Sequence, residues 1–237
     1  MRNPRNSPTR KRDAPVIDKT VASLETAVAG IPDGATILIG GFGNAGMPTE
    51  LVEALIAQGA KDLTIVNNNA GNAETGVAAL LKARRVRKIL CSFPRQTDSW
   101  VFDSLYRAGE IELELVPQGN LACRIEAAGA GLGAIFTPTG YGTTLAQGKE
   151  TREIDGRNYV LEMPIHADYA FIQAEKADRW GNLVHRKAAR NFGPIMARAA
   201  RCTVAQVKEI VPLGALDPER IVTPGIFVSR VVRATRP

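Results

Sequence analysis

Four short segments, each following an apolar run, carry glycine and small polar side chains of the kind that bind a carboxylate or a thioester. They are the glycine loop 41–46, the asparagine-rich turn 67–71, and the segments 117–120 and 137–144. Glycine lets the main chain approach a ligand, a helix N-terminus offers free N–H groups, and amides donate to oxygen. No cluster of acids or bases accompanies these segments. We therefore expect a site that positions and polarises a substrate while the covalent chemistry takes place elsewhere.

The glycine loop matches the fingerprint of a dinucleotide-binding site in form, with Gly41, Gly43 and Gly46 between an apolar run and a helical segment. That fingerprint also requires an acid about 20 residues further on, at the end of the next strand, to hold the ribose. The strand in question ends in three asparagines, at 67–69. The missing carboxylate disfavours a nicotinamide cofactor site.

Strand-like and helix-like segments alternate along the chain and must position these loops. The expected helices are 18–29, 48–58, 75–83, 98–108 and 121–128, and the expected strands are 36–39, 63–66, 86–91, 111–116, 134–136, 169–173 and 203–207. Such alternation predicts an α/β fold with a mostly parallel sheet covered by helices on both faces. Asp155-Gly156 between 151–154 and 157–161 predicts a β-hairpin excursion.

The basic charge is concentrated at the N-terminus. The chain has 237 residues and a net charge of +6, but residues 1–12 hold five basic residues and no acid, which leaves 25 basic against 24 acidic residues. We expect a disordered basic tail at 1–15, with no nucleic-acid role because no aromatic residue accompanies the charges. A single domain is expected over 16–237. With no membrane-length apolar run and no secretory signal, we expect a cytoplasmic protein.

Cysteine and histidine are too few and too dispersed for a metal site or a disulfide framework. Cys91, Cys123 and Cys202 form no close pair, and the only histidines are His166 and His185. We therefore expect no metal. His185 is a weak candidate for a general base, and the basic residues Arg186, Lys187 and Arg190 suit the phosphates of a ligand, a solvated face or a subunit contact.

The segment 33–48 resembles the signature of family I CoA-transferases of the first-subunit, or A, type. It reads Asp-Gly, two residues, three apolar residues, Gly-Gly-Phe, three residues and Gly-x-Pro. The segments 68–71, 117–119, 139–142 and 223–225 look like further landmarks of the family. The resemblance runs from about residue 17 to 235 and implies a CoA-transferase-like fold.

The segments 91–96 and 102–106 look like the branch of the family that moves CoA from succinyl-CoA to 3-oxoadipate, in the β-ketoadipate route of aromatic degradation. The branch that uses acetoacetate, a 3-ketoacid, is similar elsewhere and stays an alternative. One departure is Asn67, where relatives commonly have serine.

The resemblance also implies a mechanism and a partner. In this family a glutamate attacks succinyl-CoA to give a mixed anhydride, CoA thiolate returns to form an enzyme thioester, and the acceptor acid then takes the CoA in ping-pong fashion. That glutamate lies in a Ser-Glu-Asn-Gly motif of the second subunit, and this chain lacks the motif. A partner, the B-type subunit of an A2B2 heterotetramer, is therefore implied. No cofactor is implied, because the CoA thioester is itself a substrate.

By analogy with the family, Asn68 and Gln118 would lie near the reacting carbonyl and act as oxyanion donors or positioning groups. The substrate pocket would be formed by Gly41, Phe42, Gly43, Asn44, Ala45, Gly46, Asn69, Gly71 and Gly119.

A ligand-binding module of similar α/β fold is the alternative from another class. A repressor of that kind should carry a helix-turn-helix before the domain, but only about 17 residues precede it. A sugar-phosphate isomerase should place a carboxylate and a histidine or lysine around a phosphate loop, and we find no such set.

Overall fold

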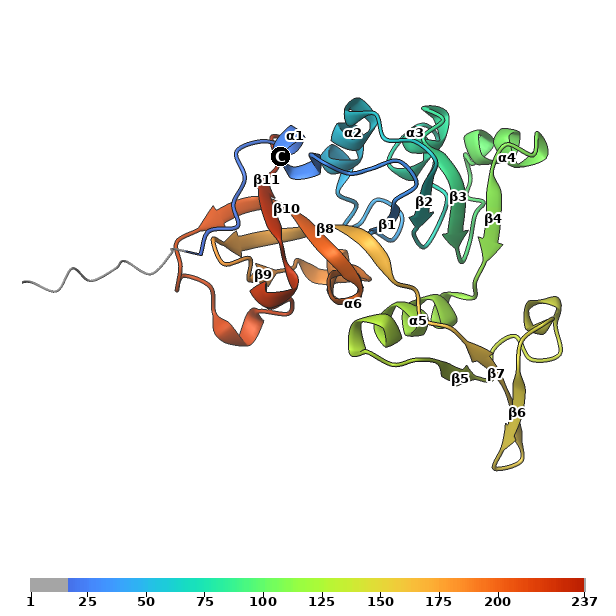
Figure 1. Cartoon of the computed structure of the whole chain (residues 1–237). Coiled ribbons are helices and arrows are strands. Elements are labelled where there is room, and N and C mark those ends of the chain that lie inside the picture. The colour runs from blue at the N-terminus through green and yellow to red at the C-terminus, as the bar shows by residue number, and fades with distance from the viewer. Residues whose placement is uncertain (1–16, 237) are drawn as a thin grey trace, which may run out of the picture.

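The computed structural model of the chain describes residues 17–236, so the expected tail at 1–15 lies outside the described residues. Its main feature is an eight-stranded sheet with the order β11-β10-β8-β1-β2-β3-β4, in which β9 also pairs with β8 (Figure 1). The strands are β1 (Thr36–Ile39), β2 (Leu63–Val66), β3 (Val86–Cys91), β4 (Glu112–Leu115), β8 (Ala167–Asp178), β9 (Leu183–Val184), β10 (Ala200–Val211) and β11 (Arg230–Arg233). Only the β8–β9 pair is antiparallel. The expected mostly parallel sheet is confirmed.

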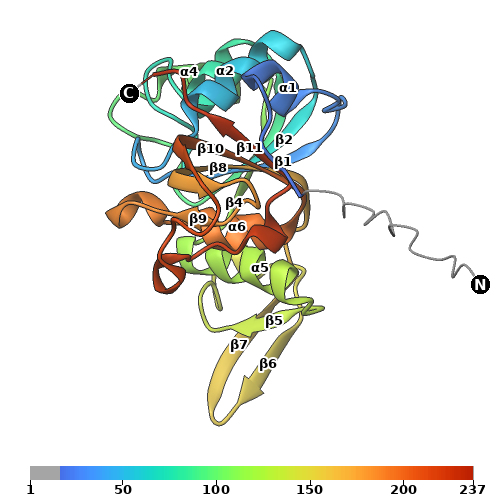
Figure 2. The same cartoon turned by 90° about the vertical axis from the view of Figure 1, so that its left-hand side faces the viewer.

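Helices cover the sheet on both faces, as expected. The helices α1 (Leu24–Val28), α2 (Thr49–Gln58), α3 (Val77–Lys82) and α4 (Trp100–Arg107) lie on one side, and α5 (Gln118–Ala130) and α6 (Gly193–Ala199) lie on the other (Figures 1 and 2). Alternate residues of β1 serve the two layers, because successive strand side chains point to opposite faces. Ile37 and Ile39 join the core beneath α1–α4, whereas Leu38 joins the core beneath α5 and α6.

Two of the expected helices begin three or more residues away from their expected first residue. The helix expected over 18–29 begins only at Leu24, because the main chain of Lys19 and Val21 hydrogen-bonds to Val231 on β11. Ser23 then caps the helix by accepting from the Thr26 N–H. The helix expected over 121–128 begins earlier, at Gln118, so Gln118 and Gly119 lie in its first turn.

A small antiparallel sheet, which we call the arm, projects from the main body below α5 (Figure 1). Its strands β5 (Ile135–Thr137), β6 (Thr151–Ile154) and β7 (Arg157–Glu162) have the order β5-β7-β6. The expected hairpin is confirmed, and Asp155 and Gly156 both have positive φ, as a tight two-residue turn requires. The expectation that 134–136 continues the parallel alternation is wrong. This segment pairs antiparallel with β7, because its partner is the hairpin and not β4.

The strands β8 and β10 are longer than the apolar segments 169–173 and 203–207 that predict them. They pair in parallel from Ala167 and Ala200 to Asp178 and Val211, and their second halves carry polar residues that the apolar pattern misses. Short 3-10 helices complete the chain: η1 (Thr144–Ala146), η2 (Lys187–Arg190), η3 (Pro218–Arg220) and η4 (Gly225–Phe227). The assignment of 16–237 to one domain stays a prediction.

Candidate active site

A cavity of about 240 Å³ lies where the loops after β1, β2 and β3 meet. The carboxyl ends of parallel strands share one edge of a sheet, which is where open α/β sheets bind ligands. The cavity is lined by Gly43, Asn44, Met47, Thr49, Asn69, Gly71, Asn72, Thr75, Gly76 and Gln96. These residues include neither an acid nor a base, so the lining is suited to holding an anionic or carbonyl group through neutral donors.

Asn67 fixes the end of β2 against β1. Its Nδ2 donates to the Ile39 main-chain oxygen over 2.7 Å, and its Oδ1 accepts from the Asn69 N–H over 2.9 Å. The side chain is completely buried. Asn67 therefore shapes the turn that presents the next two asparagines.

Asn68 and Gln118 are brought together, although 50 residues separate them in sequence. Gln118 Nε2 donates to Asn68 Oδ1 over 2.8 Å, and Ser92 Oγ donates to the same oxygen over 2.7 Å. Asn68 is only 5% exposed. Because its oxygen already accepts from two donors, its amide nitrogen is the end that remains to act as a donor towards a substrate oxygen.

Asn69 lines the cavity and contains a buried amide nitrogen without a partner in the described part of the chain. Its Oδ1 accepts from the Gly71 N–H over 2.8 Å, which fixes the orientation of the amide. Its Nδ2 is buried and has no hydrogen-bond partner among residues 17–236. A buried donor without a partner costs about 1–3 kcal/mol. An unpaired buried amide in a residue that lines a cavity is a feature typical of functional sites.

The glycine loop bends at positions that only glycine suits, and an asparagine distant in sequence holds it in place. Gly46 has φ +74°, and a Cβ there would lie 2.2 Å from the Ala189 oxygen. Asn191 Oδ1 accepts from the Gly41 N–H over 3.1 Å, and its Nδ2 donates to the Ala45 oxygen over 2.9 Å. Asn191 thus holds both sides of the loop.

The expected substrate residues divide between the cavity and its surroundings. Gly43, Asn44, Asn69 and Gly71 line the cavity, whereas Gly41, Phe42, Ala45, Gly46 and Gly119 do not. Sequence reasoning missed Met47, Thr49, Asn72, Thr75, Gly76 and Gln96, which also line it, and Asn191 behind the loop. The position of Thr49 in the first turn of a helix that follows the glycine loop was a usable signal. Asn191 offered none, because its contacts cross 150 residues.

The family profile described as Coenzyme A transferase matches residues 21–234. The chain belongs to the coenzyme A transferase family. The expected family and enzyme class are thus confirmed.

A curated CoA-transferase chain, the A-type subunit of the 3-oxoadipate CoA-transferase of Pseudomonas putida, is 70% identical over 217 residues, which cover 92% of this chain and 94% of that one. The A-type subunit of the succinyl-CoA:3-ketoacid coenzyme A transferase of Helicobacter pylori strain J99 is 46% identical over 93% of this chain and 94% of its own length. Both names designate one subunit type, which implies a second subunit in those enzymes.

The fold of the CoA-transferase family is also confirmed by a solved structure. A crystal structure of an acyl-CoA transferase apoenzyme from Escherichia coli O157:H7 matches with a TM-score of 0.83 and 26% identity. The match covers 92% of this chain and 47% of that one, so this chain spans about half of the length of the solved protein.

His185 lies outside the site of this CoA-transferase chain. Its ring nitrogens contact the Gln173 oxygen at 3.1 Å and Thr223 Oγ1 at 2.9 Å. Burial, against the opposing effect of the Gln173 oxygen and with a smaller contribution from the nearby Arg190, lowers the pKa of His185 to about 4. With Arg186 and Lys187 it lines a different cavity, of about 480 Å³. Both ring nitrogens are engaged within the protein and a pKa this low makes the ring a weak base, which argues against a general-base role.

Cysteine and acid side chains in the described part of the transferase form no metal-binding group of three or more with histidine. The three cysteines are free thiols, and burial raises the pKa of Cys91 to about 12, so it is not a reactive thiolate. None of the helices described between residues 17 and 236 is long and apolar enough to cross a membrane.

Proposed function

We propose that this chain is the A-type subunit of a CoA-transferase that moves CoA from succinyl-CoA to 3-oxoadipate. The Pseudomonas putida relative, 70% identical over most of both chains, supports this acceptor acid. The observation that carries the site assignment is the buried amide nitrogen of Asn69, unpaired among residues 17–236, in a residue that lines the cavity and directly follows Asn68 of the Asn68–Gln118 pair. Cytoplasmic location and independence from any bound cofactor are parts of the same proposal.

The nucleophile in this proposal is a glutamate of the partner, a B-type subunit. The cavity lining of this chain contains no carboxylate, and its sequence lacks the Ser-Glu-Asn-Gly motif. Phe42 and Phe93 are 53% and 62% exposed, and Phe93 forms an isolated β-bridge with Asn69. Exposed aromatic side chains therefore lie close to the candidate site. Such surface suits a subunit interface. The assembly we propose is an A2B2 heterotetramer.

The roles of the residues follow from where oxygen charge develops. When the partner glutamate attacks the thioester, the carbonyl oxygen becomes negative and CoA leaves as a thiolate. The thiolate then attacks the glutamyl carbonyl of the anhydride and releases succinate. The Asn68 amide nitrogen would stabilise the oxyanion, and Gln118 would hold Asn68 in place. The Asn69 amide and the glycine loop would bind the carboxylic acid.

The proposal is tested by measuring formation of 3-oxoadipyl-CoA from succinyl-CoA, with this chain alone and co-expressed with its second subunit. Activity only in the pair is the expected result. Activity of the single chain would contradict the placement of the nucleophile. Activity of the pair with acetoacetate alone would favour the 3-ketoacid branch, to which the Helicobacter pylori relative belongs by name. Inactivity with every acid would favour a ligand-binding module.

A further inference from the structure

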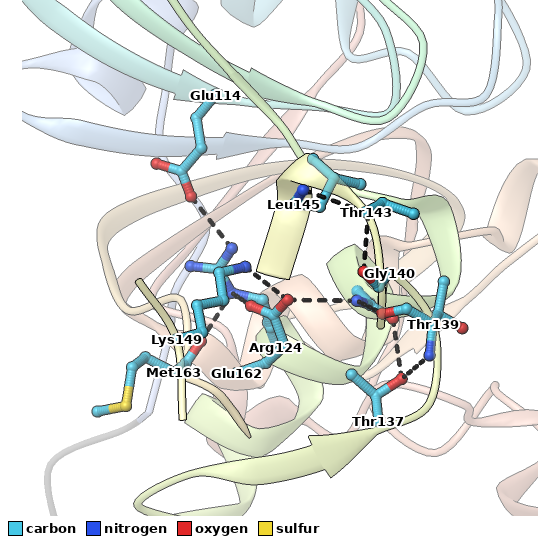
Figure 3. A network of polar contacts seen from close by, with 11 residues as sticks. Glu114, Arg124, Thr137, Thr139, Gly140, Thr143, Leu145, Lys149, Glu162 and Met163 are labelled. Carbon is cyan, nitrogen blue, oxygen red and sulfur yellow. Dashed lines mark hydrogen bonds and ion pairs between the residues drawn. The ribbon is translucent and has the colours of Figure 1, made fainter. Parts of the chain in front are cut away.

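Glu162, at the end of β7, is a buried carboxylate that the proposed reaction does not use. Its side chain is 4% exposed. A buried carboxylate is costly unless it is paired and hydrogen-bonded, so its partners indicate what it holds in place. Those partners come from two other parts of the chain. Lys149 Nζ, in the loop before β6, lies at 2.7 Å, and Arg124 Nε, on α5, lies at 3.7 Å (Figure 3). Asn120 Nδ2, also on α5, donates over 3.3 Å.

Asn120 connects this carboxylate to the candidate site. It is 2% exposed and lies two residues after Gln118, in the first turn of α5. Its Nδ2 also donates to the Thr139 oxygen over 3.2 Å, and its Oδ1 accepts from Thr137 Oγ1 over 3.1 Å. No side chain caps this helix end, so the contacts of Asn120, together with the bond from Gln118 to Asn68, are the side-chain bonds that hold its first turn.

Arg124 fixes the same face of α5 one turn later, because residues four apart lie above one another on a helix. Its Nε donates to the Met163 oxygen over 2.7 Å, and its Nη1 donates to Glu114 on β4 over 3.1 Å (Figure 3). Glu114 precedes the short link from β4 to α5. The helix start that carries Gln118 is therefore attached to both the main sheet and the arm.

We propose that Glu162 is a positioning residue for the transfer reaction, acting through Asn120 and the first turn of α5 to aim Gln118 at Asn68. This inference rests on the proposed function, because it takes the role of Gln118 from there. The arm then has a part in catalysis although β6 and most of β7 lie away from the cavity. A displacement of the reacting geometry by about 1 Å costs about 10²-fold in rate, which sets the size of the expected effect.

The test compares kcat and KM of the co-expressed pair for Glu162→Ala, Glu162→Gln, Gln118→Ala and the double variant Glu162→Ala with Gln118→Ala. Glu162→Ala should lower kcat about 10²-fold with KM for the acids little changed, because the carboxylate-binding groups lie on other elements. Glu162→Gln keeps an oxygen for Asn120 and should recover most of kcat. Gln118→Ala should have little further effect in the Glu162→Ala background, since the two residues act as one unit.

Glu150→Gln is the matched control, since Glu150 lies just before β6 and its side chain is 49% exposed, in an ion pair with Arg152. It should leave kcat and KM unchanged. A wild-type kcat in Glu162→Ala, or losses that multiply independently in the double variant, would overturn the inference alone. A wild-type kcat in Gln118→Ala would overturn the proposed role of Gln118 and this inference together. If Glu162→Ala does not assemble, the Glu162→Gln variant decides the question. A large fall in kcat in Glu162→Gln at an unchanged melting temperature would contradict positioning through Asn120.

Discussion

Gln118 and Asn68 meet through a 2.8 Å hydrogen bond from the Gln118 amide nitrogen to the Asn68 side-chain oxygen. One residue begins helix α5 and the other lies in the turn after β2, so the bond joins two strand ends of the sheet. The bond also fixes the orientation of the Asn68 side-chain amide. Its oxygen accepts from Gln118 and Ser92, which leaves the amide nitrogen to donate to the substrate.

Asn68→Ala should lower kcat about 10²- to 10³-fold, the usual effect of losing one oxyanion donor. Ser92 keeps the Asn68 main-chain oxygen as an acceptor at 3.0 Å, so the turn should survive. Steady-state kinetics of the co-expressed pair, with the thermal unfolding midpoint as the folding control, would check this. An unchanged kcat would remove Asn68 from the reaction.

Asn69→Asp should raise KM for both carboxylic acids about 10- to 100-fold, the range expected when a hydrogen bond to a charged group is lost. The new carboxylate still accepts from the Gly71 N–H but offers no donor, and it repels an anionic substrate. Asn69→Ala keeps the cavity neutral and should raise KM less. Equal KM values for the two variants would argue against an anion at this position.

Asn191→Ala should weaken substrate binding by releasing the glycine loop. The variant loses the acceptor for Gly41 and the donor for Ala45, and stability should fall by about 1–3 kcal/mol. KM measurements and urea unfolding would detect the two effects. Asn158→Ala, on the arm, is the control and should change neither. A wild-type KM in Asn191→Ala would show that the loop keeps its shape unaided.

His185 should make stability depend on pH between about 4 and 6.5. Burial lowers its folded pKa to about 4 from an ordinary value of 6.5, so the folded state favours the neutral ring. The resulting stabilisation is complete above pH 6.5 and is lost as the pH falls towards 4, by about 3 kcal/mol in all. The thermal midpoint of His185→Gln should therefore fall less steeply over this range than that of the wild type. Parallel slopes would contradict the assignment.

The local sequence pattern predicts the position of a strand correctly where the residues of that strand alone determine its structure. The strands β1 and β2 coincide with short, mainly apolar runs, because such runs must be buried in the sheet wherever they pair. The sheet to which β5 belongs was not predictable in this way. Its three residues read as a strand in either sheet, and only the contact with β7 decides between them.

The site could be predicted as a set of loops but not as a set of contacts. Strand ends with Gly and Asn identified the segments 67–71 and 117–120, because parallel strands deliver their ends to one edge. The choice of Asn68, Asn69 and Gln118 within them came from the resemblance to the family. The support behind them comes from Asn191 and Glu162, whose contacts with the loop and with α5 depend on how distant segments pack. Periodicity and turn chemistry carry no information about such pairings.

The strand order determines when the protein can complete its sheet during synthesis. The main-chain N–H of Thr36 donates to the carboxylate of Asp168, at the start of the strand that pairs with β1, and 132 residues separate the two. At ordinary translation speeds, the unpaired edge of β1 waits on the order of ten seconds for that strand to leave the ribosome. An open apolar edge can pair with other nascent chains. Chaperone binding to polysomes should therefore peak after β4 emerges and decline once β8 has been made.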